Sequence, residues 1–214
     1  MRFDLLLQAL FELQSCGESI EQELEHRRKA VHVISKKTAE YLHEEKIKNI
    51  FFIDTSARTA WVPIKYFWDT HFDPKMRPGM YFLNPDGFLD FWGDQDIRSI
   101  QKRFSQIFHI PFSQKHEPLV LFDTCAHTGG TLTPIIRLLK RLKFSDVRVI
   151  TAQDPDSGSN IKSVLRLDQF RTDMRCSIFG RDKSVRKDHD IVCKRGRCEG
   201  SLREDLKRVM QELS

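Results

Sequence analysis

Apolar residues follow two alternating spacings along this chain. Between Ser19 and about Lys46 they recur at intervals of three, four or seven residues, which places them on one face of a helix. The same spacing predicts further helices over residues 60–68, 97–108, 134–142 and 201–213. Short unbroken apolar runs lie among these helices, at 49–53, 79–83, 118–122 and 146–151, and such runs are typical of buried strands.

Strands and helices therefore alternate, and this order predicts an α/β fold. We expect three layers around a mostly parallel central sheet, with helical elaborations at both ends. No internal repeat or linker divides the chain, so the prediction is a single domain over residues 1–214: a helical N-terminal extension (1–46), a core (47–152) and a C-terminal elaboration (153–214). Pro63 suits its helix only in the first turn, so that helix is expected to begin near Ala60.

The composition limits the class of protein. With 40% hydrophobic residues among 214, the chain can bury a core, which excludes disordered and collagen-like sequences. No apolar run approaches the ~18–20 residues of a membrane span, so an integral membrane protein is not expected. The five cysteines are odd in number, and a chain of this length needs no disulfides; both features suit a reducing, cytoplasmic location.

Positive charge is concentrated near the C-terminus. The net charge is +5, and residues 181–208 hold ten Lys and Arg against six Asp and Glu. Such a segment suits an anionic ligand, either phosphate or nucleic acid, and it equally suits a solvated basic tail.

The segment that follows the third apolar run, residues 118–122, carries the candidate chemistry. Gly129 and Gly130 allow a tight turn and a close approach to a ligand, Thr128 and Thr131 add hydroxyl groups, and the next helix directs its free N–H groups into the turn. Asp123 supplies an acceptor for hydroxyl groups or a hydrated Mg²⁺. A sugar phosphate fits this arrangement, although an ordinary glycine turn is the alternative. Neither the Walker lysine nor a G-x-G-x-x-G pattern is present.

The run L-V-L-F-D-T-C-A-H-T-G-G-T-L over residues 119–132 resembles the phosphoribosyl pyrophosphate (PRPP) motif of type I phosphoribosyltransferases. Upstream, residues 50–58 (I-F-F-I-D-T-S-A-R) are similar to the strand, loop and helix that carry the pyrophosphate-binding loop of that family. Together these matches cover roughly residues 47–152. The resemblance implies the phosphoribosyltransferase fold and an enzyme that transfers the phosphoribosyl group of PRPP to a nitrogenous base, with release of pyrophosphate.

The resemblance also implies roles for individual residues. The 5-phosphate would be held by Thr128, Gly129, Gly130 and Thr131, and the pyrophosphate by Thr55, Ser56, Ala57 and Arg58. Asp123 would bind the ribose hydroxyls and a Mg²⁺ that bridges ribose and pyrophosphate oxygens. Catalysis would rest on Asp123, Arg58 and His127, although His127 has the alternative of a hydrogen bond within the turn. A nucleobase or related small molecule is the implied partner, and a homodimer is compatible with the family.

Some features favour a different class of function. Most members of the family carry a second acid where this chain has Thr124. In having a single Asp, the chain resembles the uracil-specific branch of the family. Residues 84–117, where the family places a mobile lid, are long and aromatic; Phe88, Phe91 and Trp92 either stack a base or belong to the core. The alternative hypothesis is therefore a non-catalytic PRPP or nucleotide sensor that contacts nucleic acid through residues 181–208.

Overall fold

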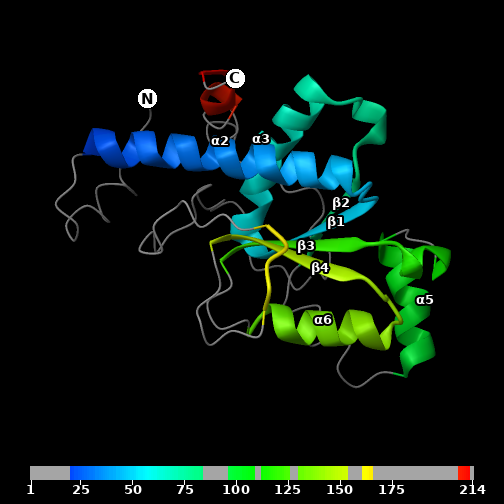
Figure 1. Cartoon of the computed structure of the whole chain (residues 1–214). Helices are drawn as coiled ribbons and strands as arrows, with labels where there is room; N and C mark the ends of the chain where they lie inside the picture. Colours follow the sequence, from blue (N-terminus) through cyan, green and yellow to red (C-terminus); the bar gives the residue numbers. More distant parts are fainter. Residues whose placement is uncertain are drawn as a thin grey trace.

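Four parallel strands form the sheet at the centre of the computed structural model, which describes residues 20–83, 96–108, 112–125, 130–153, 161–165 and 207–212. In the described part, the strands are β1 (Asn49–Ile53), β2 (Gly79–Leu83), β3 (Leu119–Cys125) and β4 (Val147–Gln153), in the order β2-β1-β3-β4 (Figure 1). The predicted α/β class and the parallel sheet are both confirmed.

The register of the sheet follows the apolar runs. Asn49 pairs with Gly79 on one side and with Leu119 on the other, and Leu119 pairs in turn with Val147. All five residues of β1 are buried, as expected for a strand covered on both faces. β3 and β4 extend beyond the predicted runs, because their pairing continues to Cys125 and Gln153.

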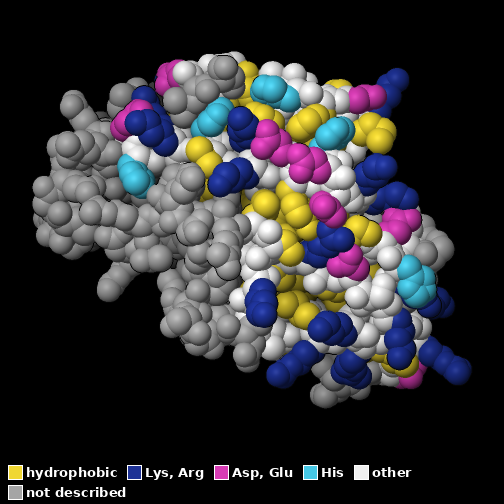
Figure 2. Space-filling model, viewed as in Figure 1, with side chains coloured by type: hydrophobic (Ala, Val, Ile, Leu, Met, Phe, Trp, Pro, Cys, Tyr) yellow, Lys and Arg dark blue, Asp and Glu magenta, His cyan; other side chains and the backbone are white. Residues whose placement is uncertain are grey.

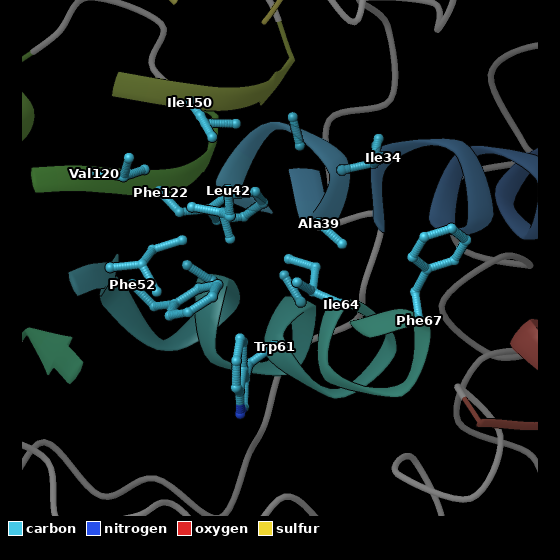
Figure 3. Packing of buried hydrophobic residues seen from close by; sticks show 14 of the residues in the cluster. Ile34, Ala39, Leu42, Phe52, Trp61, Ile64, Phe67, Val120, Phe122 and Ile150 are labelled. Carbon is cyan, nitrogen blue, oxygen red and sulfur yellow. The ribbon is translucent and has the colours of Figure 1, made fainter. Parts of the chain in front are cut away.

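Two long helices cover one face of the sheet. α2 (Ile20–Glu44) and α3 (Asp54–His71) pack against each other, and their apolar stripes meet the side chains of the strands (Figure 3). The core on this face includes Ile34, Leu42, Phe52, Ile64, Phe122 and Ile150, each fully buried. Met210, within the helical residues 207–212, is buried in the same cluster. The predicted helix at 201–213 is confirmed for the part that is described.

The opposite face is covered by α5 (Ile97–Phe108) and α6 (Leu132–Arg141). Their buried side chains pack on Phe51, Leu121 and other strand residues of this face. The ring of Phe104 on α5 lies 5.3 Å from that of Phe144, just after α6, so the C-terminal end of α6 abuts α5 (Figure 1). Two short 3-10 turns, η1 (Pro74–Met76) and η2 (Phe112–His116), complete the described elements.

One predicted boundary is wrong. α3 begins at Asp54, directly after β1, and Pro63 lies well inside it instead of in its first turn. A proline there removes the hydrogen bond to the carbonyl of Thr59. Ala60 and Ile64, which flank the proline, are fully buried, so core packing offsets the lost bond.

α2 and α6 end in the same way. In each, the residue after the C-cap has a positive φ: 52° at Lys46 and 71° at Lys143. The next N–H then bonds back into the last turn, from Ile47 to the carbonyl of Leu42 and from Phe144 to that of Leu139. This is the Schellman motif, and glycine usually holds its left-handed position.

Candidate functional site

The two segments singled out by the sequence follow neighbouring strands. β1 and β3 are adjacent in the sheet, but the chain leaves β1 through α3 toward β2 and leaves β3 through α6 toward β4. The connections therefore diverge from this point in opposite directions, on opposite faces (Figure 1). In open α/β sheets, a crevice at the carboxyl ends of such strands is the usual place for a ligand.

Asp123 lies inside the sheet, whereas the sequence placed it at the strand tip. It pairs with Thr151 of β4, and the strand continues for two more residues because β4 is long enough to pair with them. Its exposed fraction is 7%. Side chains alternate along a strand, so Asp123 points to the same face as Leu119 and Leu121, which is the face covered by α6.

The N-terminus of α6 lies on that same face. Its N-cap, Thr131, is exposed, and the Thr131 side chain makes no capping hydrogen bond. The N–H groups of Thr131, Leu132 and Thr133 have no acceptor within the helix, and the first turn contains no acidic residue. α6 begins two residues before the predicted start at 134, so Pro134 lies in its first turn. This helix end can bind an anion through its free N–H groups and its dipole.

The residues after β1 form a helix and not the predicted loop. Residues 54–58 belong to the start of α3, whose N-cap Ile53 is extended and makes no side-chain capping bond. Ala57, in the first turns of α3, is fully buried. With Ile53 as the N-cap, the N–H of Ala57 is the first one that can donate to a carbonyl within the helix. Thr55 and Ser56 precede it and leave free N–H groups at the sheet edge. The side chains of Thr55, Ser56 and Arg58 lie outside the described residues.

Thr151 is a candidate that the sequence reasoning missed. It stands beside Asp123 in the ladder and is fully buried, and its Oγ1 has no hydrogen-bond partner among the described residues. Its N–H donates to Ser163 Oγ at 3.1 Å, and the N–H of Val164 donates to the carbonyl of Val149 at 2.8 Å, so residues 161–165 run beside β4. Only the register could identify Thr151, because a threonine that ends an apolar run is unremarkable in sequence.

Several predicted site residues fall outside the described part of the chain. These are His127, Thr128 and Gly129, the three aromatic residues Phe88, Phe91 and Trp92, and residues 181–206 of the basic segment. Gly130 and Thr131, the last two residues of the predicted phosphate loop, are described and exposed.

The described residues contain no group of three or more His, Cys, Asp or Glu side chains that could hold a metal ion. Among the described residues, Asp123 would therefore be the side chain that coordinates a metal at this edge. The remaining oxygen atoms would have to come from a bound substrate or from water. No helix within the described ranges is long and apolar enough to cross a membrane.

Comparisons with known proteins add no identity to this geometry. No protein-family model, curated protein or solved structure matches the chain. Any functional conclusion therefore depends on the motif and on the arrangement of the strand ends.

Proposed function

We propose that the protein binds PRPP at the carboxyl ends of β1 and β3 and transfers its phosphoribosyl group to a nitrogenous base, releasing pyrophosphate. A type I phosphoribosyltransferase fold is part of this proposal. One observation carries it: Asp123 and the uncapped N-terminus of α6 lie on the same face of the sheet, at the point where the connections diverge. The proposal requires that these anion-binding groups and this hydroxyl acceptor contact the same sugar phosphate.

In this proposal the 5-phosphate binds at Gly130, Thr131 and the first N–H groups of α6. The hydroxyl of Thr131 is committed to no capping bond, so it can donate to a phosphate oxygen. Asp123 accepts hydrogen bonds from the ribose hydroxyls. Because that carboxylate is 7% exposed, those bonds form in a medium of low dielectric constant, where they are stronger than in water.

The pyrophosphate binds at the N-terminus of α3. Its N–H groups at Thr55 and Ser56 approach the same sheet edge from the opposite face, and the dipole of an 18-residue helix favours an anion there. Negative charge develops on the pyrophosphate as the bond to ribose breaks. Donors fixed in a helix stabilise that charge without having to reorganise.

The available donors fit a Mg²⁺ that arrives with the substrate. Mg²⁺ is commonly held by one or two carboxylates together with substrate phosphates and water, and Asp123 can provide one carboxylate. When bound, the ion partly neutralises the leaving pyrophosphate.

A second candidate is a PRPP-binding regulator without turnover. The direct passage from β1 into α3 favours it, because a helical first turn leaves no flexible loop at this position to close around a departing pyrophosphate. Both candidates need the same binding site, and they differ only in turnover.

Binding is tested by calorimetry with PRPP and Mg²⁺ on the full chain. Asp123→Asn should weaken binding at least about 10-fold, since a hydrogen bond to a charged group is worth about 1.5–3 kcal/mol. Thr131→Ala should also weaken binding about 10-fold, with little loss of stability because no capping bond is lost. Asp73→Asn is the matched control: Asp73 is exposed and caps only η1, so PRPP affinity should stay unchanged. Equal affinity of wild type and Asp123→Asn would refute the site.

Turnover is tested by incubating the protein with PRPP, Mg²⁺ and a panel of purine, pyrimidine and pyridine bases while pyrophosphate is measured. Release with one base, lost in Asp123→Asn, supports the transferase. PRPP binding without release from any base would reject the transferase in favour of the regulator.

A further inference from the structure

Charge is unevenly divided between the two helical layers. Residues 97–116 and 124–145, which include α5 and α6, contain eight Lys and Arg and no Asp or Glu. The other 172 residues carry 27 Lys and Arg against 30 Asp and Glu. These two segments therefore carry a charge of +8, compared with +4 for residues 181–208, and the acidic residues Asp96, Glu117, Asp123 and Asp146 border them.

Six of these cations form one surface, which we name the basic face. It consists of Arg98 and Lys102 on α5, Arg137, Lys140 and Arg141 on α6, and Lys143 just beyond α6, all exposed. On each helix the members are three or four residues apart, so they share its outward side. Figure 2 shows Lys and Arg side chains gathered along the lower edge of the molecule, over α6 and α5, while acidic side chains lie mostly above.

These cations differ from those of the opposite layer, because no acidic partner is found for them among the described residues. On α2 and α3, Lys29 pairs with Glu25, Lys36 with Glu40, and Lys65 with Asp69. Within the described ranges, no salt bridge reaches any member of the basic face. Six charges on adjacent helices, without an ion-pair partner in the described part of the chain, create a positive potential that attracts a polyanion.

The side chains around these charges indicate the kind of polyanion. The large hydrophobic side chains exposed within the described ranges are Met76 and Val164, neither of them on α5 or α6. Phe104 on α5 and Phe144 just after α6 are both buried. Among the described side chains of α5 and α6, the face therefore presents no exposed large apolar or aromatic group of the kind that stacks single-stranded bases, anchors a protein interface or inserts into a bilayer.

What the basic face offers is Lys and Arg interspersed with hydrogen-bonding groups, such as Ser99, Gln106 and Thr133. This combination fits contacts to phosphates that position a duplex without reading its sequence. We propose that the basic face binds the phosphate backbone of double-stranded nucleic acid. The residues of this surface differ from residues 181–208, the basic segment identified in the sequence.

Lys143 offers a way to separate charge from stability. It occupies a left-handed position, with φ 71°, that glycine holds without strain. Lys46 has the same backbone geometry at the end of α2, on the other layer. Substituting glycine at either position removes one positive charge and relieves the same strain, but only one substitution touches the basic face.

The principal experiment measures binding of the full chain to labelled 20-base-pair DNA and RNA duplexes by fluorescence anisotropy. With about four to six phosphates neutralised, affinity should fall about 10²- to 10³-fold between 50 and 200 mM salt. Arg137→Gln with Arg141→Gln, and separately Arg98→Gln with Lys102→Gln, should each lower affinity about 10-fold and reduce the log–log salt slope by about 2. Glutamine is a good helix former, so the fold should be kept.

Two controls address the alternatives. Lys29→Gln with Lys36→Gln removes two charges from α2 and should leave affinity nearly unchanged. Lys143→Gly should lower affinity about threefold while the melting temperature rises, and Lys46→Gly should raise the melting temperature alone. The proposal is overturned if neither duplex binds at 50 mM salt, if the α2 control loses as much affinity as the α5 and α6 variants, or if vesicles of anionic lipid bind and duplexes do not. Loss of binding only on deletion of residues 181–206 would also overturn it.

Discussion

The unpartnered hydroxyl of Thr151 allows a prediction in which stability and binding change in opposite directions. Burying a hydroxyl without a hydrogen bond costs about 1–3 kcal/mol, and Thr151 is fully buried with no partner for Oγ1 in the part of the chain that the structure describes. Thr151→Val keeps the branched shape and the strand preference and replaces the hydroxyl by a methyl group. We expect the variant to be more stable by about 1 kcal/mol, which is about 2–4 °C in melting temperature for a chain of this size.

The same substitution should weaken PRPP binding. Thr151 stands beside Asp123 in the ladder, so its hydroxyl is placed to support the ribose end of the proposed ligand. Losing one hydrogen bond of about 0.5–1.5 kcal/mol corresponds to a threefold to tenfold rise in Kd. A more stable protein that binds less well would mark Thr151 as a residue kept for function.

The assay compares Thr151→Val with Thr38→Val. Thr38, on α2, is also fully buried, and its Oγ1 likewise has no partner among the described residues, so it reproduces the stability effect at a position away from the strand ends. Thermal unfolding gives the stability change and calorimetry gives the PRPP affinity. A loss of 1 kcal/mol or more in Thr151→Val would refute the reasoning, because it would mean that the hydroxyl has a partner. Increased stability with unchanged PRPP affinity would remove Thr151 from the proposed site.

Two further predictions concern stability alone. Lys46→Gly and Lys143→Gly should each raise the free energy of unfolding by about 0.5–1 kcal/mol, measured in urea, since glycine adopts positive φ without strain; a loss at either position would contradict the assigned helix end. Burial is the main cause that lowers the pKa of His32 below 6.5, and the nearby Lys36 and His71 lower it further. Protonation therefore favours the unfolded chain, and stability falls as pH drops from about 6.5 toward the lowered pKa. His32→Leu should therefore lose less melting temperature than wild type between pH 7.5 and 5.5, and an equal loss would assign the pH dependence to other groups.

Much of the fold follows from the spacing of apolar residues. The runs at 49–53 and 79–83 match β1 and β2 residue for residue, because each run is bounded by polar or turn-forming neighbours. The start of α3 could not be predicted from periodicity. Its first turn, residues 54–58, is polar, and the helix is fixed by the burial of Ala57 and by strand packing instead of by an apolar stripe.

The candidate site could be predicted only in part, because its geometry also depends on tertiary pairing. The sequence identified Asp123 and the turn before α6 by residue type, but it placed Asp123 at the end of its strand. The actual position depends on how far β4 runs alongside β3, and that length is set by tertiary pairing between Cys125 and Gln153. The same pairing brings Thr151 beside Asp123, which no local pattern encodes.

α6 links the two proposals through the electrostatics of a single helix. Its first turn has no acid and no side-chain cap, so its positive end is open to an anion; its last turn carries Lys140 and Arg141, which complement the negative end. Removing either of these cations should therefore cost the fold about 0.3–1 kcal/mol, apart from any effect on nucleic-acid affinity. Arg137 lies a full turn before the C-terminus, outside the short range of the dipole, so its loss should reduce duplex affinity with little effect on stability. If α6 bound no ligand, an acidic residue in its first turn would stabilise the helix. The two proposals together account for the absence of acidic residues from α6.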